Sequence, residues 1–181
     1  MSMLILLVIY ECYANKCIGE RIVRNYLDKR LRSGTYHWHD NRFGRDRVIK
    51  ELHKRTKAMR EKGRSSISIG FIDYEKGVSR VFLEKRLVIK NQLKLGEEER
   101  VLIGVDKEDP CIIYVVFDPR IEEALLQHIG INIRDKIKDI KSKRACSVIE
   151  EYTQTASGKS LLSQLATMLE EVLCSEYTDA F

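Results

Sequence analysis

The sequence predicts an α/β fold, in which a largely parallel central sheet is flanked by helices. Apolar segments rich in Ile, Leu and Val recur along the chain at 4–10, 65–72, 100–105 and 111–117. Helical patterns stand between and after these segments, and strands that alternate with helices are typical of parallel sheets. The length of 181 residues suits one domain. We therefore expect a single α/β domain over 1–181, with a C-terminal helical segment over 131–181.

The first predicted strand is residues 4–10, an unbroken apolar run like that of a strand buried on both faces. Glu11 ends the apolar run, which is far shorter than the roughly 20 residues that a membrane span needs. No basic residue precedes the run and no A-x-A pattern follows it, so a signal peptide is not predicted. We expect a cytoplasmic protein without membrane contact.

Two helices and a strand follow. Apolar residues at helical spacing predict a helix over 15–32, which a Ser-Gly pair ends. Residues 35–44 show no regular pattern and are predicted to form a loop. A second helix is predicted over 45–62, and residues 65–72 form the second strand.

The second half of the chain continues this alternation. Residues 78–90 fit a helix slightly better than two short strands. Two apolar segments within 100–117, split by a polar turn, predict a hairpin. Asp118-Pro119 suits the N-cap and first position of a helix that runs to Ile129. A full apolar stripe predicts the last helix over 158–175.

Charge is distributed unevenly along the chain. The net charge is +5 and 33% of residues are charged, with few Asn and Gln, a thermophile-like bias. Residues 42–64 carry ten basic and three acidic side chains, and residues 134–144 carry six basic and two acidic ones. Residues 148–181 carry one basic and six acidic side chains. A basic middle and an acidic end favour a phosphate-backbone partner. Solvated helix faces are the alternative.

Nucleic acid is predicted to be held by residues from 42–64 and 134–144, and the positive face of the basic helix over 45–62 would neutralise several phosphates. Trp38 would stack on a base, and Lys159 would meet a phosphate at a helix N-terminus. Ser157–Ser160 is not a Walker A loop, because Thr153 stands where that loop needs Gly. The predicted contact residues are Arg42, Arg45, Arg47, Lys50, Lys54, Arg55, Lys57, Trp38 and Lys159.

Acidic residues stand where the first two strands end. Glu11 follows the first strand, Asp73 ends the second, and Glu75 lies two residues further on. Sites in open α/β sheets form at the carboxyl ends of parallel strands, and an i, i+2 pair in extended backbone points to one face. If the two strands are neighbours, the three carboxylates converge and need a cation such as Mg²⁺ to ionise together. Acids at strand ends also serve as caps and turn residues, which is the alternative.

Three segments carry a resemblance to a known family: 6–11, 68–75 and 118–126. A strand ending in Glu, a helix, and a later strand ending in an acidic pair resemble the TOPRIM domain of topoisomerases, bacterial-type primases, OLD-family nucleases and small stand-alone TOPRIM-like proteins. The resemblance covers about residues 4–130. It implies that Glu11 is the general acid/base, that Asp73 and Glu75 bind Mg²⁺ or Mn²⁺ beside Glu11, and that Glu122 is an auxiliary acid.

Two further features have open interpretations. The segment His37-Trp38-His39 is placed in a loop anchored by Trp38, with base stacking and metal binding as alternatives. The cysteines number five and form no C-x-x-C pair, so we interpret them as free buried thiols. A disulfide remains open, because intracellular proteins of hyperthermophiles can carry them.

Together these features predict a protein that acts on nucleic acid, DNA or RNA, by Mg²⁺-dependent phosphodiester hydrolysis. Two alternatives remain. The same basic faces would serve a nucleic-acid-binding module without catalysis. The apolar C-terminal helix would instead serve a structural or interaction protein that forms a homodimer.

Overall fold

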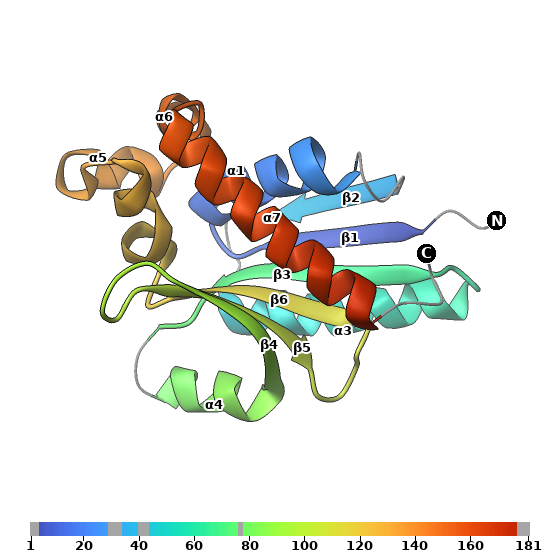
Figure 1. The fold of residues 1–181 in the computed structure, drawn as a ribbon. Helices are drawn as coiled ribbons and strands as arrows, with labels where there is room; N and C mark the ends of the chain where they lie inside the picture. Colours follow the sequence, from blue (N-terminus) through green and yellow to red (C-terminus); the bar gives the residue numbers. More distant parts are fainter. Residues whose placement is uncertain (1–3, 29–33, 40–43, 76–77, 177–181) are drawn as a thin grey trace.

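A computed structural model describes residues 4–28, 34–39, 44–75 and 78–176. Within these residues the chain forms a six-stranded mixed sheet in the order β2-β1-β3-β6-β5-β4 (Figure 1). The first four of these strands pair in parallel, and β5 and β4 continue the sheet in antiparallel pairing. The strands are β1 (Ile5–Tyr10), β2 (Gly34–His39), β3 (Ser66–Asp73), β4 (Leu87–Lys94), β5 (Arg100–Asp106) and β6 (Ile112–Asp118). The predicted α/β class is confirmed.

Helices cover both faces of the sheet. The helix α7 crosses one face together with α1, and α3 lies on the other (Figure 1). The helical elements are α1 (Tyr13–Ile22), the π-helical turn η1 (Val23–Leu27), α3 (Arg45–Glu61), α4 (Val78–Arg86), the π-helical turn η2 (Glu122–Leu126), the 3-10 turn η3 (Gln127–Ile129), α5 (Ile133–Ile140), α6 (Ala145–Thr153) and α7 (Ala156–Glu176).

Each face of the sheet has its own apolar core. The larger core packs Tyr10 and Phe71 of the sheet against α1, η2 and α7, whereas the smaller one packs Leu52 of α3 against Tyr114. Gly70 of β3 allows this close approach, because a Cβ there would lie 2.7 Å from Leu52 Cδ1. The central strands are therefore buried on both faces, as their unbroken apolar sequences predict.

Most predicted elements of the fold are present. The strand over 4–10, the helix over 45–62, the strand over 65–72 and the hairpin over 100–117 are confirmed with small shifts of their ends. The helix predicted over 15–32 is α1 and η1, and residues 29–33 lie outside the described part. The last helix is α7, and it begins two residues earlier than predicted.

Three predictions about local structure are wrong. Residues 34–39 form β2 and not a loop, because the backbone pairs with β1 at the end of the sheet. Residues 87–90 belong to the strand β4, an edge strand whose side chains are mostly exposed, so no apolar pattern marks it. Asp118 ends β6 and does not cap the next helix, because that helix begins three residues later at Ile121.

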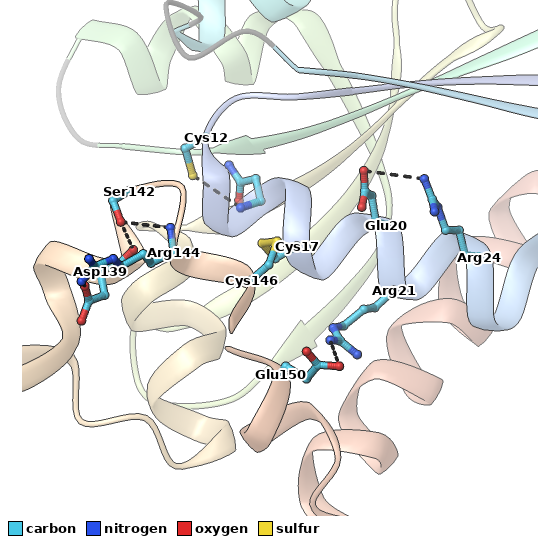
Figure 2. Close-up of a disulfide and its surroundings, with 11 residues drawn as sticks. Cys12, Cys17, Glu20, Arg21, Arg24, Asp139, Ser142, Arg144, Cys146 and Glu150 are labelled. Carbon is cyan, nitrogen blue, oxygen red and sulfur yellow. Dashed lines mark hydrogen bonds and ion pairs between the residues drawn. A yellow bond between two sulfur atoms is a disulfide. The ribbon is translucent and has the colours of Figure 1, made fainter. Parts of the chain in front are cut away.

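The interpretation of the cysteines as free thiols is wrong for one pair. Cys17 of α1 and Cys146 of α6 form a disulfide with a Cα–Cα distance of 5.1 Å (Figure 2). Cys12, Cys111 and Cys174 are free. The two bonded cysteines are 129 residues apart in the sequence, and no sequence pattern marks such a long-range pair.

Candidate functional site

The parallel pairing of β1 and β3 brings together the acids that follow them. The register matches Tyr10 with Phe71, and the Glu11 N–H continues the ladder by donating to the Phe71 carbonyl oxygen at 3.0 Å. The Glu11 side chain then turns toward β3, where its Oε2 accepts a hydrogen bond from the Asp73 N–H at 2.7 Å. The condition for the predicted convergence, that these two strands are neighbours, is met.

Asp73 joins this pair to a third acid. Its Oδ1 accepts a hydrogen bond from the Ile121 N–H at 3.0 Å, at the start of the helical segment that carries Glu122. Burial raises the pKa of Asp73, and the nearby charges of Glu11 and Glu122 raise it further. We call Glu11, Asp73 and Glu122 the acidic edge.

Burial also raises the pKa of Glu11, to about 7. The hydrogen bond from the Asp73 N–H and the charge of Arg45 act in the opposite direction, while the charge of Glu75 adds to the rise. Two neighbouring carboxyls with raised pKa values repel each other when both are ionised. A cation at the acidic edge would remove this penalty.

Two buried side chains at the acidic edge, Asn15 and Glu122, have polar atoms without a hydrogen-bond partner in the described residues. Asn15 is fully buried on the first turn of α1, and within the described residues neither atom of its amide makes a hydrogen bond of normal geometry. It lies near enough to Asp73 to lower the pKa of that carboxyl. Glu122 is 8% exposed, and its Oε2 likewise has no partner there. Such atoms are costly unless something else satisfies them, and oxygen atoms of this kind suit Mg²⁺ or Mn²⁺.

Glu75 and Arg45 are placed differently from the prediction. Glu75 has a φ of +59°, so it does not continue the extended strand and does not share a face with Asp73 in the predicted way. Arg45 is 5% exposed, donates from Nη1 to the Tyr74 carbonyl oxygen at 3.1 Å, and places Nη1 4.0 Å from Glu75 Oε2. Arg45 therefore does not belong to the exposed basic face of α3, because its guanidinium is buried beside Tyr74 and Glu75.

Cys12 begins α1 directly after Glu11. Its Sγ accepts a hydrogen bond from the Asn15 N–H at 3.5 Å, which caps the helix (Figure 2). Burial raises the pKa of Cys12, and the charge of Asp73 raises it further. The thiol is therefore protonated at neutral pH and acts as a cap.

A second group of potential metal ligands lies elsewhere. It consists of His53, Asp106 and Glu108, whose ligand atoms all lie within 4.8 Å of one another. In the part of the chain that the structure describes, no other three such residues lie this close together. The acidic edge does not meet that criterion. Asp106 Oδ2, however, already accepts hydrogen bonds from Arg86 Nε at 2.9 Å and from the Tyr114 hydroxyl at 3.1 Å, and it lies 2.9 Å from His53 Nε2.

The Arg86 guanidinium therefore already neutralises the charge of Asp106, where a metal ion would otherwise bind. Burial raises the pKa of Asp106, but hydrogen bonds from His53 and Arg86 outweigh it and hold that pKa below its ordinary value. Asp106 thus has charged and neutral partners of its own. We interpret this group as an ion-pair network that fixes α3 and α4 to the sheet.

Among the residues whose side chains the structure describes, the other predicted nucleic-acid contacts lie on two different helices, α3 and α7. Arg47, Lys50, Lys54 and Lys57 are exposed on α3, and Arg55 lies 3.4 Å from Glu51. Lys159 is exposed on α7, which packs on the opposite face of the sheet. Arg42 lies outside the described residues. Trp38 belongs to β2, of which only the backbone is described at this position.

His37 of the His-x-His segment has partners within the fold. Its Nδ1 is hydrogen-bonded to the Tyr10 hydroxyl, and its Nε2 accepts from Arg24 Nε at 3.3 Å. Burial lowers the pKa of His37, and the charge of Arg24 lowers it further. Both ring nitrogens are engaged, so His37 is part of the contact between β1 and β2.

Sequence reasoning missed two buried polar residues at this end of the sheet. Asn15 stands four residues after Glu11, on the first turn of α1. Because α1 begins at Tyr13 and not at Asn15 as predicted, Asn15 lies close to the end of β1. Asp118 is 2% exposed and ends the fourth parallel strand, where its Oδ2 accepts from Arg100 Nε at 2.7 Å. Asp118 was missed because it was predicted to be the N-cap of the following helix.

Comparison with known proteins adds no family to this geometry. No family model, no curated protein and no solved structure matches the chain. In the described residues no helix is long and apolar enough to cross a membrane. The function must therefore be inferred from the site itself.

Proposed function

We propose that the protein is a TOPRIM-like enzyme that hydrolyses phosphodiester bonds of nucleic acid with Mg²⁺ or Mn²⁺ at the acidic edge. The observation that carries the proposal is the pairing of two buried carboxyls, Glu11 and Asp73, whose pKa values are both raised. Beside them lie the unpartnered oxygens of Asn15 and Glu122. A buried set of oxygen atoms with excess negative charge fits a hard divalent cation.

Each residue has a distinct task in this proposal. Asp73 and Glu122, with Glu75 nearer the surface, would hold the ion. The bound ion supplies neutralisation of phosphate charge and a water of lowered pKa. Glu11 has a pKa of about 7 and can give or take a proton near neutral pH, as a general acid/base requires.

The test is a cleavage assay with labelled single- and double-stranded DNA and RNA, in Mg²⁺ or Mn²⁺ and in EDTA. Glu11→Gln and Asp73→Asn keep the oxygen atoms that accept the Asp73 and Ile121 N–H groups, so the fold should survive. Glu123→Gln is the matched control, because Glu123 is exposed one residue from Glu122.

We expect metal-dependent cleavage by the wild type and by Glu123→Gln. Glu11→Gln and Asp73→Asn should each lose roughly 100-fold or more in rate, the scale of general acid–base catalysis. Cleavage that persists in EDTA, or that is equal in all four proteins, would show that the acidic edge is not the active site. Binding without cleavage in the wild type would favour the non-catalytic module.

A further inference from the structure

The two basic segments lie differently with respect to the acidic edge. Helix α3 begins at the edge with Arg45 and runs back along the far face of the sheet (Figure 1). Lys54 is nine residues further on, or about 14 Å along the axis. Residues 134–144 instead stand with α5 and α6 beyond the end of the sheet at which β1 and β3 finish (Figure 1).

The segment 134–144, which we call the basic strap, presents its charge to solvent. All six of its basic side chains are exposed, and only Arg144 among them has an ion pair given by the structure, with Asp139 at 3.8 Å. In α5 the one buried residue is Ile140. An element with so little apolar anchoring and a net charge of +4 contributes more to the surface potential than to the core.

Charges on the other side of the edge have the opposite sign. The turn between β4 and β5 and the end of β6 line a hollow of about 450 Å³. Four acidic side chains and two basic ones surround it, so the acids are in excess by two: Glu97, Glu98, Glu99 and Asp118 against Lys94 and Arg100. The pairing of Arg100 with Asp118 places this turn at the same end of the sheet as the acidic edge. A polyanion would be repelled there and attracted on the side of the basic strap.

A covalent bond holds the basic strap near the acidic edge. Cys146 lies two residues after Arg144, and its partner Cys17 is buried on α1. Cys17 follows Cys12 by five residues, or about 8 Å along the helix, so the bond lies close to the end of β1 (Figure 2). The ion pair between Arg21 and Glu150, at 3.3 Å, is a second tie between α1 and α6.

We propose that the basic strap is the clamp that holds the phosphate backbone of nucleic acid beside the acidic edge, and that the Cys17–Cys146 disulfide anchors it. This inference rests on the proposed function for the chemistry at the edge. It assigns the substrate grip to the C-terminal segment, which lies outside the TOPRIM-like part, and not to α3. The eight residues of α5 span about 12 Å, the length of three or four phosphates in one strand of a duplex.

The first test compares two triple variants of equal charge. Lys138→Gln, Lys141→Gln and Lys143→Gln remove three exposed cations of the strap, and Lys50→Gln, Lys54→Gln and Lys57→Gln remove three exposed cations of α3. Each triple variant lowers the net charge from +5 to +2, because three unit charges are removed. The probe is fluorescein-labelled DNA of about 20 nucleotides, single-stranded or duplex, titrated by anisotropy in Ca²⁺ at several salt concentrations.

We expect the strap variant to bind about 10- to 100-fold more weakly than the wild type at low salt, with a salt slope smaller by about three. The α3 variant should stay within about threefold of the wild type. Equal weakening in both variants, loss only in the α3 variant, or no binding by the wild type would overturn the clamp. If the wild type binds in the expected pattern but cleaves nothing, the hydrolase proposal fails while the clamp stands.

The second test addresses the anchor. Cys146→Ser removes the bond through its exposed partner, and Cys174→Ser, at an exposed free cysteine, is the control. Circular dichroism confirms that each variant is folded at the temperature of the titration. We expect Cys146→Ser to bind DNA several-fold more weakly than Cys174→Ser. Dithiothreitol reduces the disulfide to two thiols and is itself oxidised. It should weaken DNA binding by Cys174→Ser to the level of Cys146→Ser, and should not change binding by Cys146→Ser. Equal binding of the two variants would overturn the role of the disulfide.

Discussion

The raised pKa of Glu11 makes a quantitative prediction about stability. A carboxyl whose pKa rises from 4.5 to about 7 on folding holds its proton more tightly in the folded state. The stability that Glu11 contributes is fully present below the pKa of the unfolded chain. It is lost as the pH rises through the pKa of the folded protein. The total loss is roughly 3 kcal/mol, of which roughly 2 to 3 kcal/mol falls between pH 5 and pH 8.

Replacing Glu11 by Gln should remove this loss. The amide is neutral at every pH and still offers an oxygen to the Asp73 N–H. The variant should therefore gain roughly 2 to 3 kcal/mol relative to the wild type between pH 5 and pH 8. Asp73 adds to the same trend, because its pKa is raised partly by the charge of Glu11.

The assay is urea denaturation followed by circular dichroism at pH 5 and pH 8, in EDTA and without thiol reductant. Glu123→Gln serves as the control for a change of charge at an exposed position. Wild type and Glu123→Gln should lose stability together as the pH rises. If Glu11→Gln loses as much as the wild type over this range, Glu11 is not protonated in the folded protein and the reasoning about the acidic edge is wrong.

The remaining predictions concern the packing that supports the site. Asp106→Asn should lower the free energy of unfolding by about 3 to 5 kcal/mol, because it removes the buried negative charge that pairs with Arg86. Asp109→Asn should cost under about 1 kcal/mol, because its partner Arg60 is exposed, and a larger cost than that of Asp106→Asn would contradict our interpretation of the network. Gly70→Ala should cost about 1 to 3 kcal/mol because the added methyl meets Leu52. Gly44→Ala, where nothing lies within 4 Å, is its control in the same denaturation series.

The parallel centre of the fold was predictable, and its edges were not. β1 and β3 are buried on both faces, so their apolar sequences mark them directly. β2 and β4 are held by backbone pairing with one neighbour each, and backbone hydrogen bonds leave no trace in the sequence. Sequence patterns detect burial of side chains more readily than strand pairing.

The candidate site divides in the same way. Glu11 and Asp73 were found because they end buried strands, and β1 and β3 proved to be neighbours. The place of Glu75 was missed because its left-handed backbone is a local turn. Arg45 was counted with the surface charges because helical periodicity does not show what packs beyond the N-terminus of a helix.

The Cys17–Cys146 bond also changes what a break in the chain would do. It closes residues 17–146 into a covalent ring, from which 1–16 and 147–181 extend as tails. Glu11 lies on the first tail, whereas Asp73 and Glu122 lie within the ring. A protease that cuts once inside the ring, for example at the exposed turn near Glu97 and Glu98, leaves a single covalent molecule. All three acids remain joined in it until a reductant opens the bond.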